Sequence, residues 1–189
     1  IAYAVGPNIN LPMAAAIEPR ALDAISKAVR RKARVSAHER ALIEALARRY
    51  GTPPGAARAA RDSAYASALR VVAQRYPRDV DTQVLLADAL LNPQPGTLEL
   101  VAALERALQL EPNHAGACHL YVHAVEASNT PERALPCAER LPRLMPGAGH
   151  IVHMPAHTYL RMGRYEDAAR ANIAAVEADP GDPDNAQMA

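Results

Sequence analysis

Residues 146–180 have the sequence PGAGHIVHMPAHTYLRMGRYEDAARANIAAVEADP, a helical stretch with a proline at each end. Proline has no backbone N–H and cannot continue a helix, so such a residue marks a helix end. The same punctuation recurs along the chain at Pro77, Pro112, Pro146 and Pro180. A nearly fixed period of this kind predicts a stack of equivalent helical units.

The period is about 34 residues, which is the length of the tetratricopeptide repeat (TPR), and the last unit resembles that helix–turn–helix family. The matching positions are aromatic, glycine, alanine and proline residues at the family's spacing: Tyr159, Gly163, Tyr165, Ala168, Ala175 and Pro180. The preceding unit keeps Ala134 but has Leu141 where the last unit has Ala175, and the unit before that keeps Ala107. Small residues at these positions let paired helices approach closely.

The composition favours an all-α fold. Half of the 189 residues are apolar, yet there is no Phe or Trp, so alanine, the best helix former, supplies much of the apolar content. We expect a right-handed TPR-type solenoid of antiparallel helix pairs, forming one domain over residues 1–189 with repeats ending near 77, 112, 146 and 180. Helices are predicted near residues 17–35, 37–50, 56–76, 80–91, 97–110, 115–128, 131–144, 149–162 and 165–179.

Helix caps support these boundaries. Ser36 and Glu39 have the spacing of a capping box, and Thr130 followed by Pro131 is typical of an N-cap and a first helical residue. The segment 91–97 contains two prolines and a glycine, and two interpretations stay open: a tight loop or the remnant of a longer one. The start of the chain, Ile1–Val5, has the pattern of an apolar helix end, from which we expect a truncated polypeptide.

Charge and hydropathy limit the partners. The formal net charge is +1, from 21 basic and 20 acidic residues, which argues against a nucleic-acid partner. We expect the one basic run, residues 30–34, to coat a solvated helix end. No apolar stretch approaches the roughly 20 residues that span a bilayer, so no membrane span is expected. Two cysteines make no disulfide framework, which leaves a cytoplasmic or a periplasmic location open.

Six of the seven histidines lie within residues 114–157. His119 and His123 are four residues apart, and the pair His153 and His157 has the same spacing one repeat period later. Residues at i and i+4 share one helix face, so each pair can hold one metal ion between its imidazoles. In TPR numbering, these positions and that of His150 line the concave groove, so all five side chains are expected to face one channel.

Five neighbouring imidazoles predict a transition-metal site for copper, iron or zinc, with the ligands drawn from His119, His123, His150, His153 and His157. Glu126 and Arg161, at later groove positions, are candidates to orient a ligand or a metal-bound histidine, or else to pair with other charges. Pro155, between two of the histidines, predicts a kink that either aims them inward or is simply tolerated.

Other candidate residues have plainer interpretations. His114 lies in an inter-repeat turn, where a structural or supporting role is expected, and His38 is expected at the surface. Cys118 and Cys137 fall on the two helices of one repeat, where we interpret them as small apolar packing residues rather than redox groups or ligands.

Two segments are similar to a bacterial TPR subfamily. They are Gly6-Pro-Asn-Ile-Asn10 and the histidine-rich block PGAGHIVHMPAHTY of residues 146–159, which is preceded by GACHLYVHAVEAS of residues 116–128. The resemblance extends over nearly the whole chain and implies the fold and the groove. It implies no assigned reaction.

Three functions follow as hypotheses. The first is a TPR scaffold whose groove binds a transition-metal ion, for small-ligand binding or for metal-dependent redox or hydrolytic chemistry. The second is a metal-free interaction module that binds a peptide or protein partner in the groove. The third is haem held by two histidines. Enzymatic activity is possible, but no motif in the sequence indicates it. The chain has no Gly-rich phosphate loop, no Ser-His-Asp order and no acidic pair with an evident role.

Overall fold

A computed structural model of the chain describes residues 6, 13–14, 16–52, 57–91 and 97–181. These residues form helices and turns with no strand, which confirms the prediction of an all-α fold. Contacts divide the chain into two compact units, residues 1–95 and 96–189, and each is described by itself. The expectations for Ile1–Val5 and for most of the segment 91–97 lie outside the described residues.

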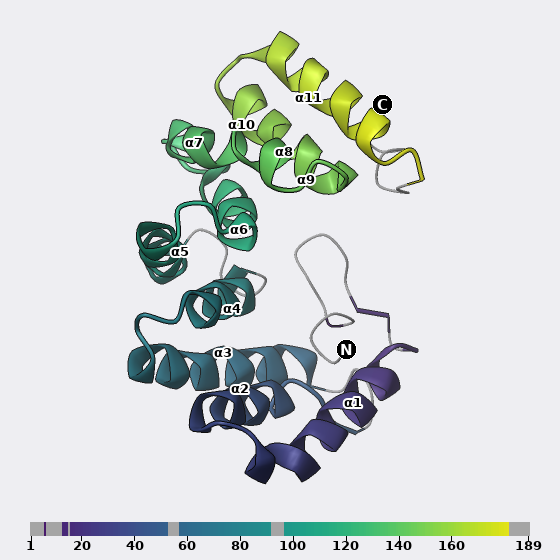
Figure 1. Cartoon of the computed structure of the whole chain (residues 1–189), viewed down its shortest axis with the longest axis vertical. Coiled ribbons are helices and arrows are strands. Elements are labelled where there is room, and N and C mark those ends of the chain that lie inside the picture. Colours follow the sequence, from purple (N-terminus) through teal and green to yellow (C-terminus); the bar gives the residue numbers. More distant parts are fainter. Residues whose placement is uncertain (1–5, 7–12, 15, 53–56, 92–96, 182–189) are drawn as a thin grey trace. The chain divides into compact units, whose positions relative to one another are not determined.

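In the described residues of unit 1, four α-helices and a 3-10 turn follow one another along the chain. Each helix packs on the next (Figure 1): α1 Glu18–Arg31, η1 Lys32–Arg34, α2 Ala37–Ala47, α3 Arg58–Arg75 and α4 Val80–Leu91. A cluster of Ala21, Ile25 and Tyr50 forms part of the core between the first helices. On α3 and α4 the buried faces are mostly alanine, leucine and valine, which suits close helix packing.

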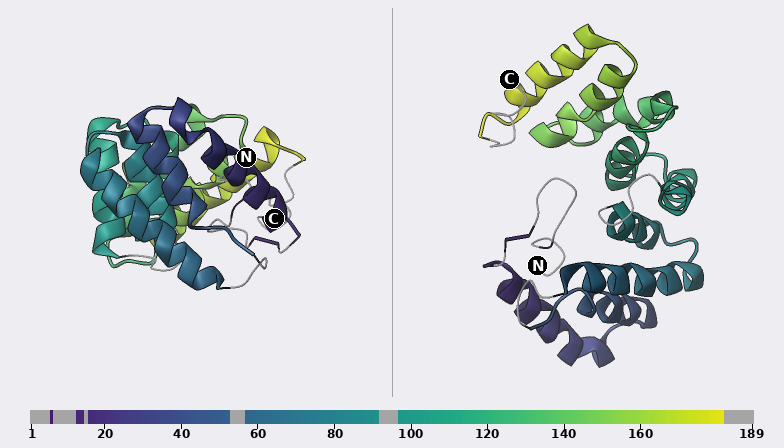
Figure 2. Two further views of the ribbon diagram at one scale, coloured as in Figure 1. Left: turned by 90° about the horizontal axis from the view of Figure 1, so that it is seen from below. Right: turned by 180° about the vertical axis from the view of Figure 1, so that it is seen from behind.

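Unit 2 has longer helices at its two ends and short helical segments between them. Its elements are α5 Leu98–Leu110, α6 Ala115–Val125, η2 Pro131–Ala134, α7 Leu135–Ala138, α8 Leu141–Leu144, α9 Gly149–His153, α10 Pro155–Arg161 and α11 Tyr165–Ala178. Helix α6 contacts α5, α7 and α10, and α11 packs along α9 and α10, as the two further views in Figure 2 also show. This packing brings α6, α9 and α10 together, and these three helices carry the histidines.

The four prolines that set the period end four helices in the same way. Helices α3, α5, α8 and α11 each stop two residues before one of them, at Arg75, Leu110, Leu144 and Ala178. The residue between adopts nearly the same backbone angles each time, with φ from −124° to −144° and ψ from 61° to 88°. The α region is disfavoured for a residue before proline, and at these four positions the chain turns out of the helix.

The same four helix ends share one hydrogen bond. The N–H of the residue before each proline donates to the carbonyl four residues earlier, and the acceptors are Val72, Ala107, Leu141 and Ala175. Three of these acceptor residues, Ala107, Leu141 and Ala175, have no solvent exposure. The period found in the sequence is therefore a period in the structure of helix ends.

Prolines also divide the helix that was predicted over residues 131–144. The segment is a 3-10 turn followed by the two short helices α7 and α8, and each of these three pieces has a proline in its first turn, Pro131, Pro136 or Pro142. A proline deletes one backbone donor and is tolerated only where a helix begins. One continuous helix was therefore a wrong prediction here, although the helical range is confirmed.

The predicted kink at Pro155 is present. Helix α9 ends at His153 and α10 begins at Pro155, with Met154 in helical conformation between them. The Ile151 carbonyl, which loses the donor at Pro155, accepts a 3.4 Å hydrogen bond from the Met154 N–H instead. The turn that follows α10 contains Gly163 at φ +73°, a left-handed conformation that glycine adopts without steric cost.

Two predictions about polar residues of unit 1 had different outcomes. Ser36 and Glu39 form the predicted capping box at the start of α2. The prediction that His38 is a surface residue was wrong, because its ring is half-buried and packs 4.3 Å from the ring of Tyr76, and its Nε2 lies 2.8 Å from the Thr82 hydroxyl. His38 lies in the first turn of α2, where a solvent-exposed side chain was predicted. Tyr76 at the end of α3 and Thr82 on α4 cover its ring instead.

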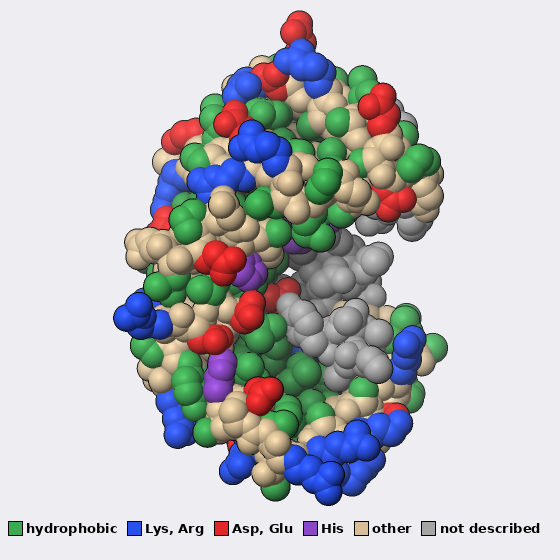
Figure 3. Space-filling view, in the orientation of Figure 1, with side chains coloured by type: hydrophobic (Ala, Val, Ile, Leu, Met, Phe, Trp, Pro, Cys, Tyr) green, Lys and Arg blue, Asp and Glu red, His purple; other side chains and the backbone are tan. Residues whose placement is uncertain are grey.

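Basic side chains gather over the end of unit 1 that holds α1 and η1, at the foot of Figure 3. Arg30, Arg31 and Arg34 are exposed there, while Lys32 is partly covered and pairs with Glu44 at 2.7 Å. Among the described residues, no helix combines the length and the apolar character that crossing a membrane requires.

Candidate metal centre

Five histidines from three helices of unit 2 form one continuous cluster. His119 and His123 lie on α6, His150 and His153 on α9, and His157 on α10. Neighbouring rings have centroids 4.8 to 6.3 Å apart, and the sequence of contacts runs from His119 and His150 through His123 to His157 and His153. The offset of one repeat period thus places the two pairs side by side. We call these five residues the histidine cluster.

Two overlapping groups in the cluster have the spacing of metal ligands. One is His119, His123 and His150, and the other is His123, Glu126 and His157; in each group the ligand atoms lie within 4.8 Å of one another. Two ligands of one ion with bonds of about 2.0–2.1 Å lie at most about 4.2 Å apart, so each group needs only a small adjustment to close on an ion. No group of this kind in the described part of the chain holds all five imidazoles.

His119 and His150 bring one pair of ring nitrogens into contact. Their Nε2 atoms are 3.0 Å apart, and the two rings meet edge to face. His123, on the same face of α6 as His119, completes the group. Its Nε2 atom is buried and has no hydrogen-bond partner among the described residues. A buried polar atom without a partner is rare and calls for a physical explanation, and an ion or ordered water is the usual one.

His153 and His157 form a second nitrogen pair, with their Nε2 atoms 3.0 Å apart. On the far side of each ring, Nδ1 meets an acceptor: the Asn172 side-chain oxygen at 2.8 Å for His153 and a Glu126 carboxylate oxygen at 2.7 Å for His157. An Nδ1 that donates to its acceptor carries a proton, and in a neutral ring the Nε2 atom then has a lone pair. Both Nε2 atoms are then left with lone pairs that face each other.

Two facing lone pairs repel unless a cation lies between them. A proton at this place would make one ring an imidazolium. Burial lowers the pKa of His153 and outweighs the hydrogen bond to Asn172, which acts to raise it. The His153 ring therefore resists protonation, and a metal ion between the two Nε2 atoms would not require it. Acceptors behind both rings are the usual support for metal-bound histidines, because they fix the tautomer and the ring orientation.

Glu126 connects the two helical pairs. It is the C-terminal cap residue of α6, and its two carboxylate oxygens face different rings: Oε2 is 2.7 Å from His157 Nδ1 and Oε1 is 3.6 Å from His123 Nδ1. Burial acts to raise the pKa of Glu126, but its contacts with His123 and His157 prevail and lower that pKa to about 2. The carboxylate is ionised near neutral pH and adds one negative charge to the cluster.

His119 is held in its neutral form. Burial, followed by the neighbouring His123, His150 and His157 rings, lowers the pKa of His119 to about 3. A neutral imidazole has a free lone pair and is the form that binds zinc, copper or iron. Near neutral pH this side chain is therefore a ready ligand rather than a cation that repels one.

His153 faces His157 but belongs to neither ligand group, and the remaining sequence candidates also lie outside these groups. Arg161 is on the exposed end of α10, where it donates to the Ser128 carbonyl at 3.4 Å. His114 caps the start of α6, because its Nδ1 accepts from the Ala117 N–H at 3.1 Å; this is the structural role expected for it. Cys118 and Cys137 are buried, as expected for packing residues.

Sequence reasoning missed one residue of this centre, Asn172. It lies within α11 and positions His153 from behind. A signal was present, because asparagine is a poor helix former and here interrupts the alanine-rich segment 168–175. A polar residue in that position suggests a specific acceptor role.

The comparisons with known proteins place no constraint on this centre. A scan against protein-family models finds none that matches the chain, and a search of the curated proteins finds no match either. The interpretation therefore depends on the residues and their geometry.

Proposed function

We propose that the protein binds a first-row transition-metal ion, copper, iron or zinc, in the histidine cluster. The observation that carries the proposal is the facing pair of His153 and His157, each with its Nδ1 beside an acceptor and with the two Nε2 atoms 3.0 Å apart. The buried Nε2 of His123, beside His119 and His150, supports it independently. Both features are those of nitrogen atoms prepared to donate to a metal rather than to each other.

The ligand chemistry points to a late transition metal. Neutral imidazoles with one carboxylate suit zinc, copper and iron, whereas magnesium and calcium prefer oxygen ligands alone. The group His123, Glu126 and His157 has two histidines and one carboxylate, a set that leaves positions open for water or a small ligand when it binds iron. Whether the ion serves small-ligand binding or redox or hydrolytic chemistry depends on those open positions.

We further propose that the scaffold is a TPR-type solenoid of the bacterial subfamily that the sequence resembles, over the whole chain. Support comes from the recurring helix ends before Pro77, Pro112, Pro146 and Pro180 and from the buried small residues at the helix crossings, Ala107, Ala168 and Ala175. In this proposal, equivalent helices of consecutive repeats supply the two histidine pairs.

Elemental analysis tests the metal proposal. Protein purified without a polyhistidine tag and supplied with zinc, copper or iron should retain at least one ion per chain after gel filtration. Replacing His123, which both ligand groups share, and His157 together with alanine should reduce the content to background. The matched control is His114→Asn, which removes a neighbouring histidine but keeps a side chain that can cap α6.

Two results would contradict the proposal. One is wild-type protein that is folded by circular dichroism yet retains no ion from any of the three metals. The other is metal content that is unchanged in the double variant. A haem absorption band in the visible spectrum of the purified protein would instead support the haem hypothesis.

A further inference from the structure

The two cysteines lie against each other at the base of a pocket that is separate from the histidine cluster. Cys118 is on α6 and Cys137 on α7, and their sulfur atoms are 2.7 Å apart. Cys118 has no solvent exposure, while Cys137 is 5% exposed. A disulfide joins sulfurs about 2.0 Å apart, so bond formation requires an approach of roughly 0.7 Å.

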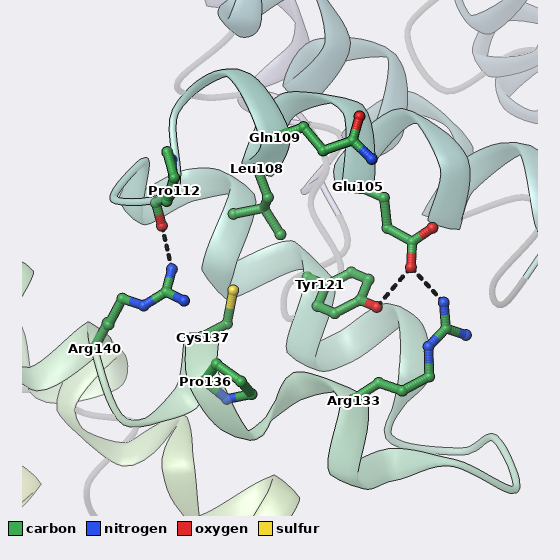
Figure 4. A pocket seen from close by; sticks show the side chains of 9 residues that line it. All are labelled: Glu105, Leu108, Gln109, Pro112, Tyr121, Arg133, Pro136, Cys137 and Arg140. Carbon is green, nitrogen blue, oxygen red and sulfur yellow. Dashed lines mark hydrogen bonds and ion pairs between the residues drawn. The ribbon is translucent and has the colours of Figure 1, made fainter.

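The pocket gives Cys137 access to small molecules. It has a volume of about 430 Å³ and is lined by residues of α5, α6, η2 and α7 and of the turns beside them. Figure 4 shows the Cys137 sulfur directed into the space that Leu108 and Tyr121 border. A volume of this size admits a small organic molecule. Cys118 lines no part of the pocket.

The charged side chains of the pocket favour an anionic ligand. Arg133 pairs with Glu105, which also accepts a 2.9 Å hydrogen bond from the Tyr121 hydroxyl. Arg140 donates to the Pro112 carbonyl, a neutral acceptor, so its positive charge is not cancelled. The lining residues thus carry a formal net charge of +1, from two arginines and one glutamate. A carboxylate on an entering molecule complements that charge.

We infer that Cys118 and Cys137 form a reversible disulfide by exchange with a small, carboxylate-bearing disulfide that enters this pocket. Contact with the Cys118 sulfur and burial raise the pKa of the Cys137 thiol, so the attack is made by the small fraction of Cys137 that has given its proton to water. That thiolate attacks one sulfur of the molecule and expels the first small thiolate. The Cys118 sulfur then loses its proton and attacks the Cys137 sulfur, which expels the second. Two electrons pass from the protein thiols to the small disulfide, and both leaving thiolates take up a proton.

The inference does not depend on the proposed metal function, because both sulfurs lie outside the two ligand groups. Its test is therefore run in the presence of a chelator, which removes metal-catalysed oxidation. The protein is incubated with glutathione disulfide, its remaining thiols are alkylated after denaturation, and the product is weighed by mass spectrometry.

The expected product has no alkylated thiol and is two hydrogen atoms lighter than the reduced chain. Dithiothreitol should restore both thiols. The disulfide closes a loop between α6 and α7, so the oxidised protein should melt about 5 °C or more above the reduced protein. Two free thiols in folded protein, under conditions that oxidise the denatured chain, would overturn the inference. So would a product that carries glutathione on both cysteines.

Single variants separate the two sulfurs. Cys118→Ala leaves the pocket-facing Cys137 without a partner, so it should accumulate a mixed disulfide with glutathione. Cys137→Ala leaves only the fully buried Cys118, which should stay a free thiol. The reverse pattern, in variants shown to be folded by circular dichroism, would refute the assignment of Cys137 as the point of entry.

A further variant tests whether the pocket recognises the negative charge of the small disulfide. Arg140→Gln should slow oxidation by glutathione disulfide at least severalfold while leaving oxidation by the neutral 2-hydroxyethyl disulfide unchanged. Equal effects on the two reagents, or no effect on either, would show that the pocket does not select a carboxylate.

Discussion

Glu126 is the residue on which both halves of the histidine cluster depend. Its carboxylate reaches His157 at 2.7 Å and His123 at 3.6 Å, and these residues belong to different helices. In one metal-binding mode the carboxylate is itself a ligand; in the other it holds the two rings from behind. Both modes need its negative charge, which the low pKa of Glu126, about 2, maintains near neutral pH.

Replacing Glu126 with glutamine tests this role. The substitution keeps the size and a hydrogen-bond acceptor but removes the charge, so we expect metal affinity to fall by about 10- to 100-fold, the usual effect of losing a supporting carboxylate. Competition with a chromophoric chelator measures the change. Glu132→Gln, an exposed neighbour on η2, is the matched control and should bind like the wild type. Equal affinity of Glu126→Gln and wild type would contradict the assignment.

His119 makes the metal-free protein sensitive to acid. Its pKa is about 3 in the folded state and 6.5 when unperturbed, so between these values the unfolded chain binds a proton that the folded chain does not. Stability is therefore greatest above pH 6.5 and falls as the pH drops toward 3. We expect chelator-treated protein to unfold at a lower urea concentration at pH 5 than at pH 7.5. The difference between the two midpoints should be smaller in His119→Gln. The same loss in both proteins would contradict this account.

At the scale of single elements, the break between α9 and α10 lies within the histidine cluster. A proline inside a helix costs about 3 kcal/mol, yet Pro155 stands between His153 and His157. Beside this break the two Nε2 atoms lie 3.0 Å apart, while Asn172 on α11 and Glu126 on α6 contact the outer nitrogens. Helix regularity is thus lost at the point where the imidazoles converge.

The variant Pro155→Ala separates the two effects. It returns the backbone N–H that Ile151 lacks, so the melting temperature of the metal-free protein should stay the same or rise. Metal affinity should fall about tenfold, because a straighter helix moves one imidazole off its acceptor. Calorimetry and a chelator titration measure the two quantities. A variant that binds metal as well as the wild type would show that the kink is merely tolerated.

The elements also show how far sequence analysis extends. The helix ends before Pro77, Pro112, Pro146 and Pro180 were predictable because proline acts through local backbone chemistry. The division of residues 131–144 into three pieces was not predicted, because the repeat pattern predicts one helix over this range. Pro136 and Pro142, which start the two short helices, are the signal for the division. His38 was misplaced because its cover comes from α3 and α4, distant in sequence.

The candidate site was predictable in part for the same physical reason. The i, i+4 spacing fixes which histidines share a helix face, the repeat period fixes which helices are equivalent, and the five imidazoles do lie together. Spacing does not fix rotamers or tautomers. The grouping into two ligand sets, the bare Nε2 of His123 and the part played by Asn172 depend on side-chain geometry and were not predictable.

At the scale of the whole molecule, the ligands are confined to one of two compact units. All candidate ligands belong to residues 96–189, and they come from helices that are packed together only in the folded state. An ion that binds the folded unit but not the unfolded chain stabilises it by mass action, by about 2.7 kcal/mol at a concentration 100 times Kd. Metal binding and the stability of this unit are therefore linked.

Metal loading should consequently raise the melting temperature of the transition that involves unit 2 by several degrees, and the shift should grow with ion concentration. Scanning calorimetry with and without a chelator measures it. The double variant His123→Ala and His157→Ala should melt at one temperature whatever the ion concentration. A wild-type transition that does not respond to any of the three ions would contradict the linkage.

The central claim is that imidazole nitrogens of the cluster bind a transition-metal ion directly. X-ray absorption spectroscopy of tag-free, metal-loaded protein tests it most directly. We predict a nitrogen or oxygen shell at about 2.0–2.1 Å together with the outer-shell scattering of at least two imidazole rings, lost in the His123→Ala and His157→Ala double variant. A spectrum without imidazole scattering, or one that the double variant leaves unchanged, would contradict the account.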